Sequence, residues 1–363
     1  MNETKSMSMI GKKFKTTPMI GASLDHLYSL SHHDIEMLYG RVSAKFEKNE
    51  IIAGSDIKIR IKIQFGINGF KKNSTIALVW RMPEDWGEPQ FEHLGESNFF
   101  SAKSSKTKKL KLKFSHRSGP APWGHMLTID NEGEDLQKSD VLDIFCGNNE
   151  KNYPGWQAPT SINPRQFFMI LQRPREEKVW VKMAELQNLK IVPGEASKIS
   201  ITVPSQMVIN ETISIIIRMT DIWGNPSRGY KGDFCFDNSD IIANQVERLK
   251  FNNEEIDVWK FNLTIFKQGI HRIRVRTKDN LFSSISNPIK CMVSLEMYSV
   301  YWGDMHSGQC NLGCGQGDLE SYFQFAKDVA GIQFMSHQAN DVYVTKYDWE
   351  YIRKASKKFN EDK

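Results

Sequence analysis

The chain has 363 residues, which exceeds the usual size of a single hydrophobic core, so two or three domains are expected. Hydrophobic residues make up 40% of the chain and charged residues 25%, which excludes wholesale disorder and fibrous repeats. The net charge of +5 is spread too thinly over this length to indicate nucleic-acid binding.

The N-terminus predicts a flexible tail over residues 1–20, because its apolar residues are isolated among acids and lysines and form no secretory signal. No stretch of the chain approaches eighteen uninterrupted apolar residues, so no membrane span is expected. The five cysteines are odd in number and mostly far apart, which does not resemble a disulfide framework. We therefore expect a cytoplasmic protein.

Residues 21–188 are predicted to form a first β-sandwich. Ile57 to Phe65 and Lys109 to Phe114 alternate apolar and polar residues, which is the period of a strand with one solvated face. Turn signals such as Asp85-Trp86-Gly87 separate the strands. Most of the nine tryptophans should lie in sandwich cores, although some could line a ligand groove.

Residues 189–296 are predicted to form a second, immunoglobulin-like sandwich. The tight turn expected at residues 221–226 follows directly after one of its strands. The predicted strands are Lys198 to Val203, Thr212 to Met219, Trp259 to Phe266, Ile270 to Thr277 and a closing strand from Asn287 to Glu296.

Residues 297–363 change character to β-loop-α-β-loop-α, the order of an α/β-barrel or doubly wound domain that is begun but not completed. Ser299 to Trp302 and Ile332 to Met335 are predicted as short strands, and a second helix is expected from Thr345. The first helix should start at Asp318 and end at Gly331, with one buried face formed by Leu319, Tyr322, Phe323, Ala326, Val329 and Ala330.

Candidate chemistry lies where the two predicted strands end. Asp304 and His306 follow the first strand and His337 follows the second, so all three should meet at the carboxyl edge of a parallel sheet. Asn340 or Asp341 could equally be the residue used there in place of His337. Converging imidazoles could bind zinc, manganese or iron.

These residues belong to a longer run that resembles a known superfamily. The segments YWGDMHSGQ, DLESYFQFAKDVAGIQF and SHQANDVYVT look like the opening of the PHP (polymerase and histidinol phosphatase) superfamily, and in particular the DUF3604 family of unknown function. The order of elements from Tyr301 to Trp349 matches as a whole. Residues 85–90, upstream, also resemble the DUF3604 family.

The resemblance implies a distorted (β/α) barrel that binds two or three divalent metals and hydrolyses phosphoesters, with metal-activated water as the nucleophile. By this resemblance Asp304, His306 and His337 are the inherited catalytic and metal-binding residues. The sequence departs from the superfamily at Gly308, which has no side chain where a second histidine is expected. The remaining ligands would come from strands beyond Lys363, so the chain is expected to be truncated, and this fragment could hold no metal at all.

Two other motifs leave alternatives open. Cys310 and Cys314 could join His306 and His337 in a zinc site, or be small loop residues or oxidation-prone thiols. The basic run from Lys103 to Arg117 could attract a polyanion, but its alternation favours a solvated strand face.

The sequence thus supports two functions. The first is the N-terminal part of a metal-dependent hydrolase, inactive as this fragment, acting on a small-molecule or phosphoester-like substrate. The second is a non-catalytic β-sandwich binding or scaffold protein with a vestigial hydrolase segment. No nucleic acid or membrane partner is expected, and exposed sheet edges could support an oligomer.

Overall fold

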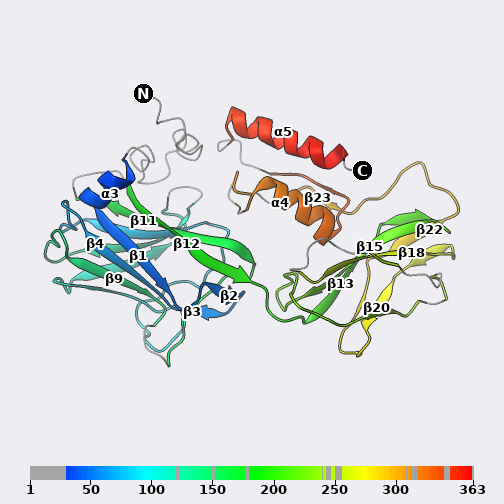
Figure 1. The fold of residues 1–363 in the computed structure, drawn as a ribbon, viewed down its shortest axis with the longest axis horizontal. Helices are drawn as coiled ribbons and strands as arrows, with labels where there is room; N and C mark the ends of the chain where they lie inside the picture. Colours follow the sequence, from blue (N-terminus) through cyan, green and yellow to red (C-terminus); the bar gives the residue numbers. More distant parts are fainter. Residues whose placement is uncertain are drawn as a thin grey trace. The chain divides into compact units, whose positions relative to one another are not determined.

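The structure is a computed structural model that describes residues 30–119, 123–148, 152–175, 180–238, 240–242, 247–249, 256–306, 310–312, 315, 317–338 and 344–361. The predicted tail, Cys314, Gly308, Asn340 and Asp341 lie outside these residues. The fold is mainly β, with two consecutive immunoglobulin-like sandwiches followed by an α/β segment, as predicted (Figure 1).

The chain divides into two compact units. The first contains Met1–Val192, Asn311–Gln316 and Ala339–Arg353, and the second contains Pro193–Cys310, Gly317–Gln338 and Lys354–Lys363. The boundary falls after Val192, whereas the sequence analysis placed it after residue 188. The strand β12 continues to Val192 because Lys190–Val192 pairs in parallel with Glu50–Ile52.

The first sandwich has two main sheets that share one core. One sheet has the order β1-β4-β9-β6 and the other β2-β12-β11-β5-β8-β7, and β3 and β10 form a separate pair. The bounds are β1 Gly40–Phe46, β2 Glu50–Ile52, β3 Asp56–Ile57, β4 Ile59–Phe65, β5 Thr75–Trp80, β6 Phe100–Ser104, β7 Leu110–Ser115, β8 His125–Asn131, β9 Val141–Cys146, β10 Trp156–Gln157, β11 Asn163–Arg173 and β12 Val181–Val192.

Alternation decides which side chains fill this core. Along β4 every second residue is buried, from Ile59 to Phe65, because successive side chains of a strand point to opposite faces. Lys111 and Lys113 on β7 face outward, and Lys113 Nζ lies 2.8 Å from Asp130 Oδ2 on β8. The structure therefore places the predicted basic strand as a solvated face with paired charges.

Aromatic rings fill the centre of the first sandwich. The indole of Trp156 is fully buried, and its ring centroid lies 4.1 Å from that of Trp86 and 5.2 Å from that of Trp80. The predicted turn at residues 85–87 thus carries a core side chain. Trp223, Trp302 and Trp349 are exposed, and the other six tryptophans are buried, as expected for most of them.

Helix α3 (His32–Leu38), at the start of the described chain, was missed by the sequence analysis. Ser31 caps this helix, since its Oγ accepts a hydrogen bond from the Asp34 N–H at 3.1 Å. Ile35 and Tyr39 are buried in the core of the first sandwich. The pattern Ser31-His32-His33-Asp34 was the available signal for a helix start.

The second sandwich is built from three sheets, with orders β13-β15-β18-β17, β14-β22-β19 and β16-β20-β21. Its core contains residues from the central strands, including Ile199, Ile217, Phe261, Val275 and Ile289. The bounds are β13 Lys198–Thr202, β14 Gln206–Val208, β15 Thr212–Thr220, β16 Phe234–Phe236, β17 Glu247–Leu249, β18 Val258–Thr264, β19 Gly269–His271, β20 Arg274–Thr277, β21 Ser283–Ile285 and β22 Ile289–Met292.

The strand predicted over Ile270 to Thr277 was wrong as a single element. β19 pairs with β22, whereas β20 pairs with β16 and β21, so the chain changes sheets between them. At the break the Ile273 N–H donates to Ser286 Oγ at 2.9 Å. A side-chain acceptor therefore replaces the strand partner at this position.

The predicted turn after β15 is present and is organised by Asp221. Its Oδ1 accepts hydrogen bonds from the N–H groups of Trp223 and Asn225, both at 2.9 Å, and its Oδ2 accepts from Gly194 N at 3.0 Å. Burial opposes the charged form, but these bonds together lower the pKa of Asp221. Gly224 adopts a φ of +95°, as a tight turn requires.

The C-terminal segment contains β23 (Gly303–Asp304), α4 (Leu319–Gln324), the π-helix η2 (Phe325–Ala330), β24 (Phe334–Met335) and α5 (Lys346–Glu361). The predicted helical face is largely buried through Leu319, Phe323, Ala326 and Val329. The strand predicted at residues 299–302 was wrong in position. Val300 and Tyr301 are exposed, and ladder pairing starts only at Gly303. No helix in the described part of the chain is both long enough and apolar enough to cross a membrane.

One buried acid, Glu84, makes the stability of the first sandwich depend on pH. Glu84 is 5% exposed, and its Oε2 accepts hydrogen bonds from Trp86 Nε1 at 3.1 Å and Gln166 Nε2 at 2.6 Å. Burial raises the pKa of Glu84 from 4.5 to about 8, against the opposing effect of these bonds and of the nearby Arg81 charge. The folded state therefore holds a proton at neutral pH that the unfolded chain releases.

We expect the free energy of unfolding of the first sandwich to fall as pH rises from about 4.5 to about 8, by on the order of a few kcal/mol. Glu84→Gln should flatten this slope because the amide stays neutral. The exposed Glu92→Gln is the control and should leave the slope unchanged. Urea denaturation at several pH values measures it, and an unchanged slope in Glu84→Gln would contradict the assignment.

Candidate metal-binding edge

The candidate site lies where β23 and β24 end side by side. The two strands pair in parallel, with Gly303 opposite Phe334 and Asp304 opposite Met335. The Ser336 N–H extends this ladder by donating to the Asp304 carbonyl at 3.1 Å. The main chain therefore delivers Asp304 and His337 to the same edge, as the sequence predicted.

The turn after β23 is fixed by short-range hydrogen bonds. Asp304 Oδ1 accepts from the His306 N–H at 2.9 Å, which orients the acid toward its own loop. The carbonyl of Met305 accepts from Ser336 Oγ at 2.6 Å and from Gln338 Nε2 at 2.8 Å. Ser336 and Gln338 thus join the two loops, a role that the sequence analysis did not assign to them.

The three predicted site residues differ in their surroundings. Asp304 and His306 are exposed, whereas His337 is half-buried. The Nε2 of His337 lies 3.2 Å from the Sγ of Cys310, which is fully buried. The ring of Tyr322 on α4 meets the His337 imidazole edge-on, with centroids 6.0 Å apart.

The contact between Cys310 and His337 bears on the alternative zinc grouping. Thiolate and imidazole are both zinc ligands, and these two side chains are in direct contact. The third member, Cys314, lies outside the described residues. Within the described residues, no group of three or more histidine, cysteine, aspartate or glutamate side chains could hold a metal ion. The donors present thus fit a multinuclear metal centre only in part.

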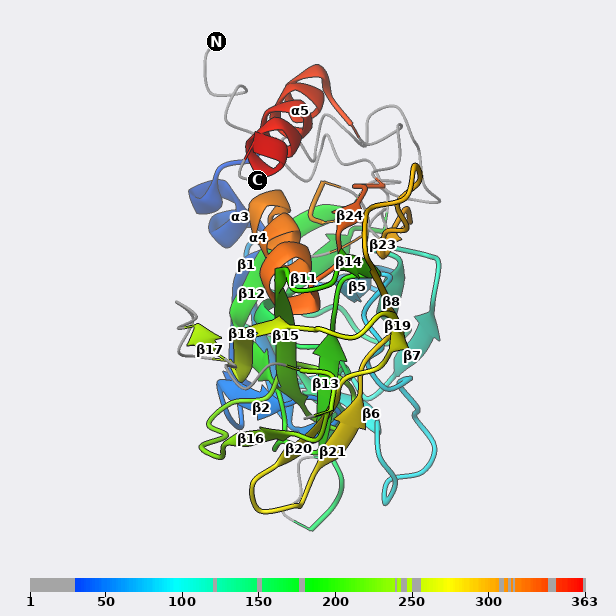
Figure 2. The same ribbon diagram turned by 90° about the vertical axis from the view of Figure 1, so that its right-hand side faces the viewer.

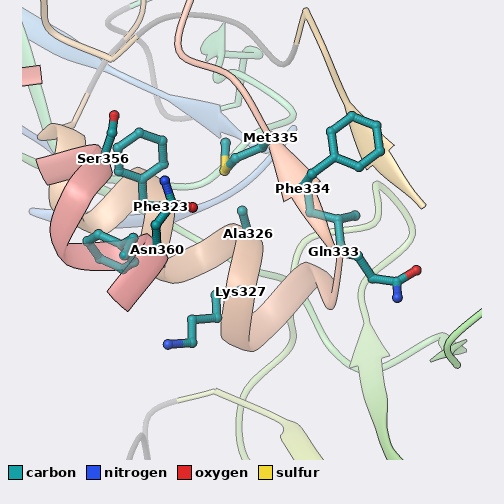
Figure 3. Close-up of a pocket in the computed structure, with 10 residues that line it drawn as sticks. Phe323, Ala326, Lys327, Gln333, Phe334, Met335, Ser356 and Asn360 are labelled. Carbon is teal, nitrogen blue, oxygen red and sulfur yellow. The ribbon is translucent and has the colours of Figure 1, made fainter. Parts of the chain in front are cut away.

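A pocket of about 260 Å³ lies beside this edge, on the helical side of β24. Figure 3 shows Phe323 on α4 and Ala326 on η2 near Met335 on β24, with Lys327 of η2, and Ser356 and Asn360 of α5, also bordering the pocket. None of the predicted site residues lines it. The ring centroids of Phe323 and Phe359 lie 5.3 Å apart, so the pocket is bordered by helix-to-helix packing.

Comparisons with known proteins identify no family. No family model matches the chain, and no protein of curated function matches it significantly. Several solved structures are similar in part: InvD of Yersinia pseudotuberculosis (11% identity, 75% of this chain and 62% of that chain, TM-score 0.29), the Escherichia coli adhesin FdeC (12%, 69% and 63%, 0.24), and the C-terminal domain of the Streptococcus agalactiae AgI/II polypeptide BspA (8%, 69% and 100%, 0.28). The chain thus spans less than two thirds of the InvD and FdeC chains, and TM-scores this low carry no functional inference.

Helix α4 is positioned by its N-cap, Asp318. Its Oδ1 accepts from the Ser321 N–H at 2.9 Å and its Oδ2 from Ser321 Oγ at 2.6 Å. Burial opposes the charge of Asp318, but these hydrogen bonds together lower its pKa. The cap fixes where the helix starts and therefore where Tyr322 meets His337.

Asp318→Ala should lower the free energy of unfolding of this segment by about 1 kcal/mol, because the cap acceptor is lost. Asp318→Asn keeps an acceptor oxygen and should cost less. Since the folded pKa is depressed, the contribution of the charge should be present above pH 3.8 and be lost as pH falls further. Urea denaturation at pH 7 and pH 3 measures both effects, and equal cost in the two variants would contradict a capping role.

Proposed function

We propose that this protein is a non-catalytic β-sandwich binding or scaffold protein, in which the second sandwich holds the C-terminal β-α-β unit in place. The observation that supports this proposal is the packing of η2 against the face formed by β15 and β18, a contact that we call the seat of η2. Val329 is buried in a cluster with Ile216 on β15 and Val258 on β18. The same arrangement can be followed in Figures 1 and 2, where the α4 and η2 helix lies beside β15.

Polar contacts surround this apolar seat. Lys260 Nζ on β18 lies 2.7 Å from Asp328 Oδ1, and Thr202 Oγ1 on β13 donates to the Ala330 carbonyl at 3.1 Å. The residue that precedes β24 is also in contact with the second sandwich, since Ser205 Oγ donates a hydrogen bond to Gln333 Oε1 at 3.1 Å. Three strands and the loop before β14 therefore hold one helix and the strand that follows it.

Gly331 makes the close approach possible. It ends the helix with a φ of +69°, and a Cβ added there would lie 2.9 Å from Ile216 Cδ1 and 3.2 Å from Thr202 Cβ. The predicted helix-ending glycine thus has a second role, because a side chain at this position would require Ile216 and Thr202 to shift.

Gly331→Ala should destabilise the second unit more than Gly317→Ala does. Both glycines have φ near +70°, so both substitutions carry the same left-handed strain of about 1–2 kcal/mol, but nothing lies within 4 Å of a Cβ at Gly317. Overpacking against Ile216 should add about 1–3 kcal/mol at Gly331. Urea denaturation measures the difference, and equal costs would count against the proposed seat.

Metal-dependent hydrolysis is the second candidate, and the parallel pairing of β23 with β24 supports it. This pairing brings Asp304 and His337 to one edge, in keeping with the resemblance to the opening of a PHP domain. A divalent metal there would supply an activated water for a phosphoester or similar small substrate. The described donors fit such a centre only in part.

Metal analysis of the purified chain tests this second candidate. If the edge binds metal, the chain should hold zinc, manganese or iron there, and the double variant His306→Ala, His337→Ala should hold one equivalent less than wild type. His271→Ala changes a half-buried histidine of the second sandwich; it is the control and should keep the metal. Equal metal content in wild type and double variant would rule out a metal role for these histidines.

We further propose a cytoplasmic location and association through exposed sheet edges, as expected from the sequence. The described cysteines Cys146, Cys235 and Cys291 are free thiols, which supports a reducing compartment.

A further inference from the structure

A second pair of histidines lies in the first sandwich, at the open end of the β7–β8 ladder. Ser115 on β7 pairs with Met126 on β8, so His116 and His125 occupy the next pair of opposed positions. Directly opposed residues on antiparallel strands project from the same face with neighbouring Cβ atoms. The sheet therefore sets the two imidazoles against each other.

The facing nitrogens have the spacing of two ligands on one metal. His116 Nδ1 and His125 Nδ1 lie 3.3 Å apart. Zinc–nitrogen bonds of about 2.0–2.1 Å in a tetrahedral site place two ligand nitrogens about 3.3 Å apart. His116 has a side chain that is 57% exposed, so it can rotate to turn its Nδ1 lone pair toward a metal bound by His125 Nδ1.

Each imidazole also has an acceptor on its other nitrogen. His125 Nε2 lies 2.9 Å from the Met82 carbonyl, and His116 Nε2 lies 3.4 Å from Glu88 Oε2. With a metal bound, protons on both Nε2 atoms would satisfy these acceptors and leave both Nδ1 atoms available as ligands. Metal-binding histidines typically donate their second N–H to a carbonyl or carboxylate in this way.

Stacking holds the more buried ring in place. The His125 ring stacks on the indole of Trp80 with centroids 5.5 Å apart and an angle of 28° between the ring planes, and the Phe114 ring packs against both histidines. One ligand is thus fixed in the sheet, while the other is exposed and adjustable.

We propose that His116 and His125 form a binding site for a divalent transition-metal ion of the zinc class, with water or an external ligand in the remaining positions. Glu88 and the Met82 carbonyl position the rings and do not contact the metal. The site is separate from the edge formed by Asp304, His306 and His337, and it would add a metal-dependent binding function to the first sandwich.

Zinc titration of the full chain by calorimetry tests this site. Wild type should bind one zinc equivalent that His116→Gln weakens by at least about 10-fold, and Glu88→Gln should weaken it by about 10-fold. His93→Gln, a change to an exposed histidine of the same sandwich, and the double variant His306→Ala, His337→Ala should both retain this equivalent. If wild type and His116→Gln titrate alike, the proposal is wrong.

Histidine ¹⁵N NMR gives a readout that does not depend on any variant. Addition of zinc should shift the Nδ1 resonances of His116 and His125 together and leave the ring nitrogens of His93 in place. Shifts confined to other histidines, or none at all, would overturn the proposal.

Discussion

The seat of η2 on the second sandwich is the contact on which the C-terminal architecture depends. A two-stranded parallel pair cannot be stable alone, because it offers one short ladder and little buried surface. Here β24 follows directly from a helix that buries Val329 against Ile216 and Val258 and pairs Asp328 with Lys260. The sandwich therefore holds the helix that leads into β24, and β23 pairs with β24.

The candidate edge at the ends of β23 and β24 is organised mainly by hydrogen bonds. The hydrogen bonds that fix it are made mostly by the main chain and by small polar side chains, such as Ser336 and Gln338 on the Met305 carbonyl. Asp304 and His306 remain exposed, and His337 is held beside Cys310. The edge is thus a hydrogen-bonded main-chain turn that carries the exposed side chains of Asp304 and His306.

The sequence predicted most of the strands, because half-buried antiparallel strands alternate strictly, as along Ile59–Phe65. It failed where a contact distant in sequence decides the outcome. The break between β19 and β20 depends on Ser286, and the late start of β23 depends on its partner at Phe334. The π-helical geometry of η2 was not predictable from the sequence either, because apolar residues spaced three and four apart also fit an ordinary α-helix.

The candidate metal-binding edge, like the strands, was predictable in part from the sequence. Asp304 and His337 were expected to lie close together because the carboxyl ends of neighbouring parallel strands meet at one edge. The pairing of β23 with β24 brings their main-chain positions to the same edge. The contact of Cys310 with His337 and the opposed pair His116 and His125 depend on loop conformation and strand register, which composition does not encode. Glu84 was missed for the same reason, because its burial is set by Gln166, far along the chain.

Native-state hydrogen exchange in increasing urea tests most directly whether the second sandwich holds the β-α-β unit. The amides to follow are those of residues 325–336 and those of the central strand β15. If the sandwich is the scaffold, both sets should exchange through the same opening, with equal opening free energies and equal urea dependence. Exchange of residues 325–336 through a separate opening of much lower free energy, with β15 still protected, would contradict this account.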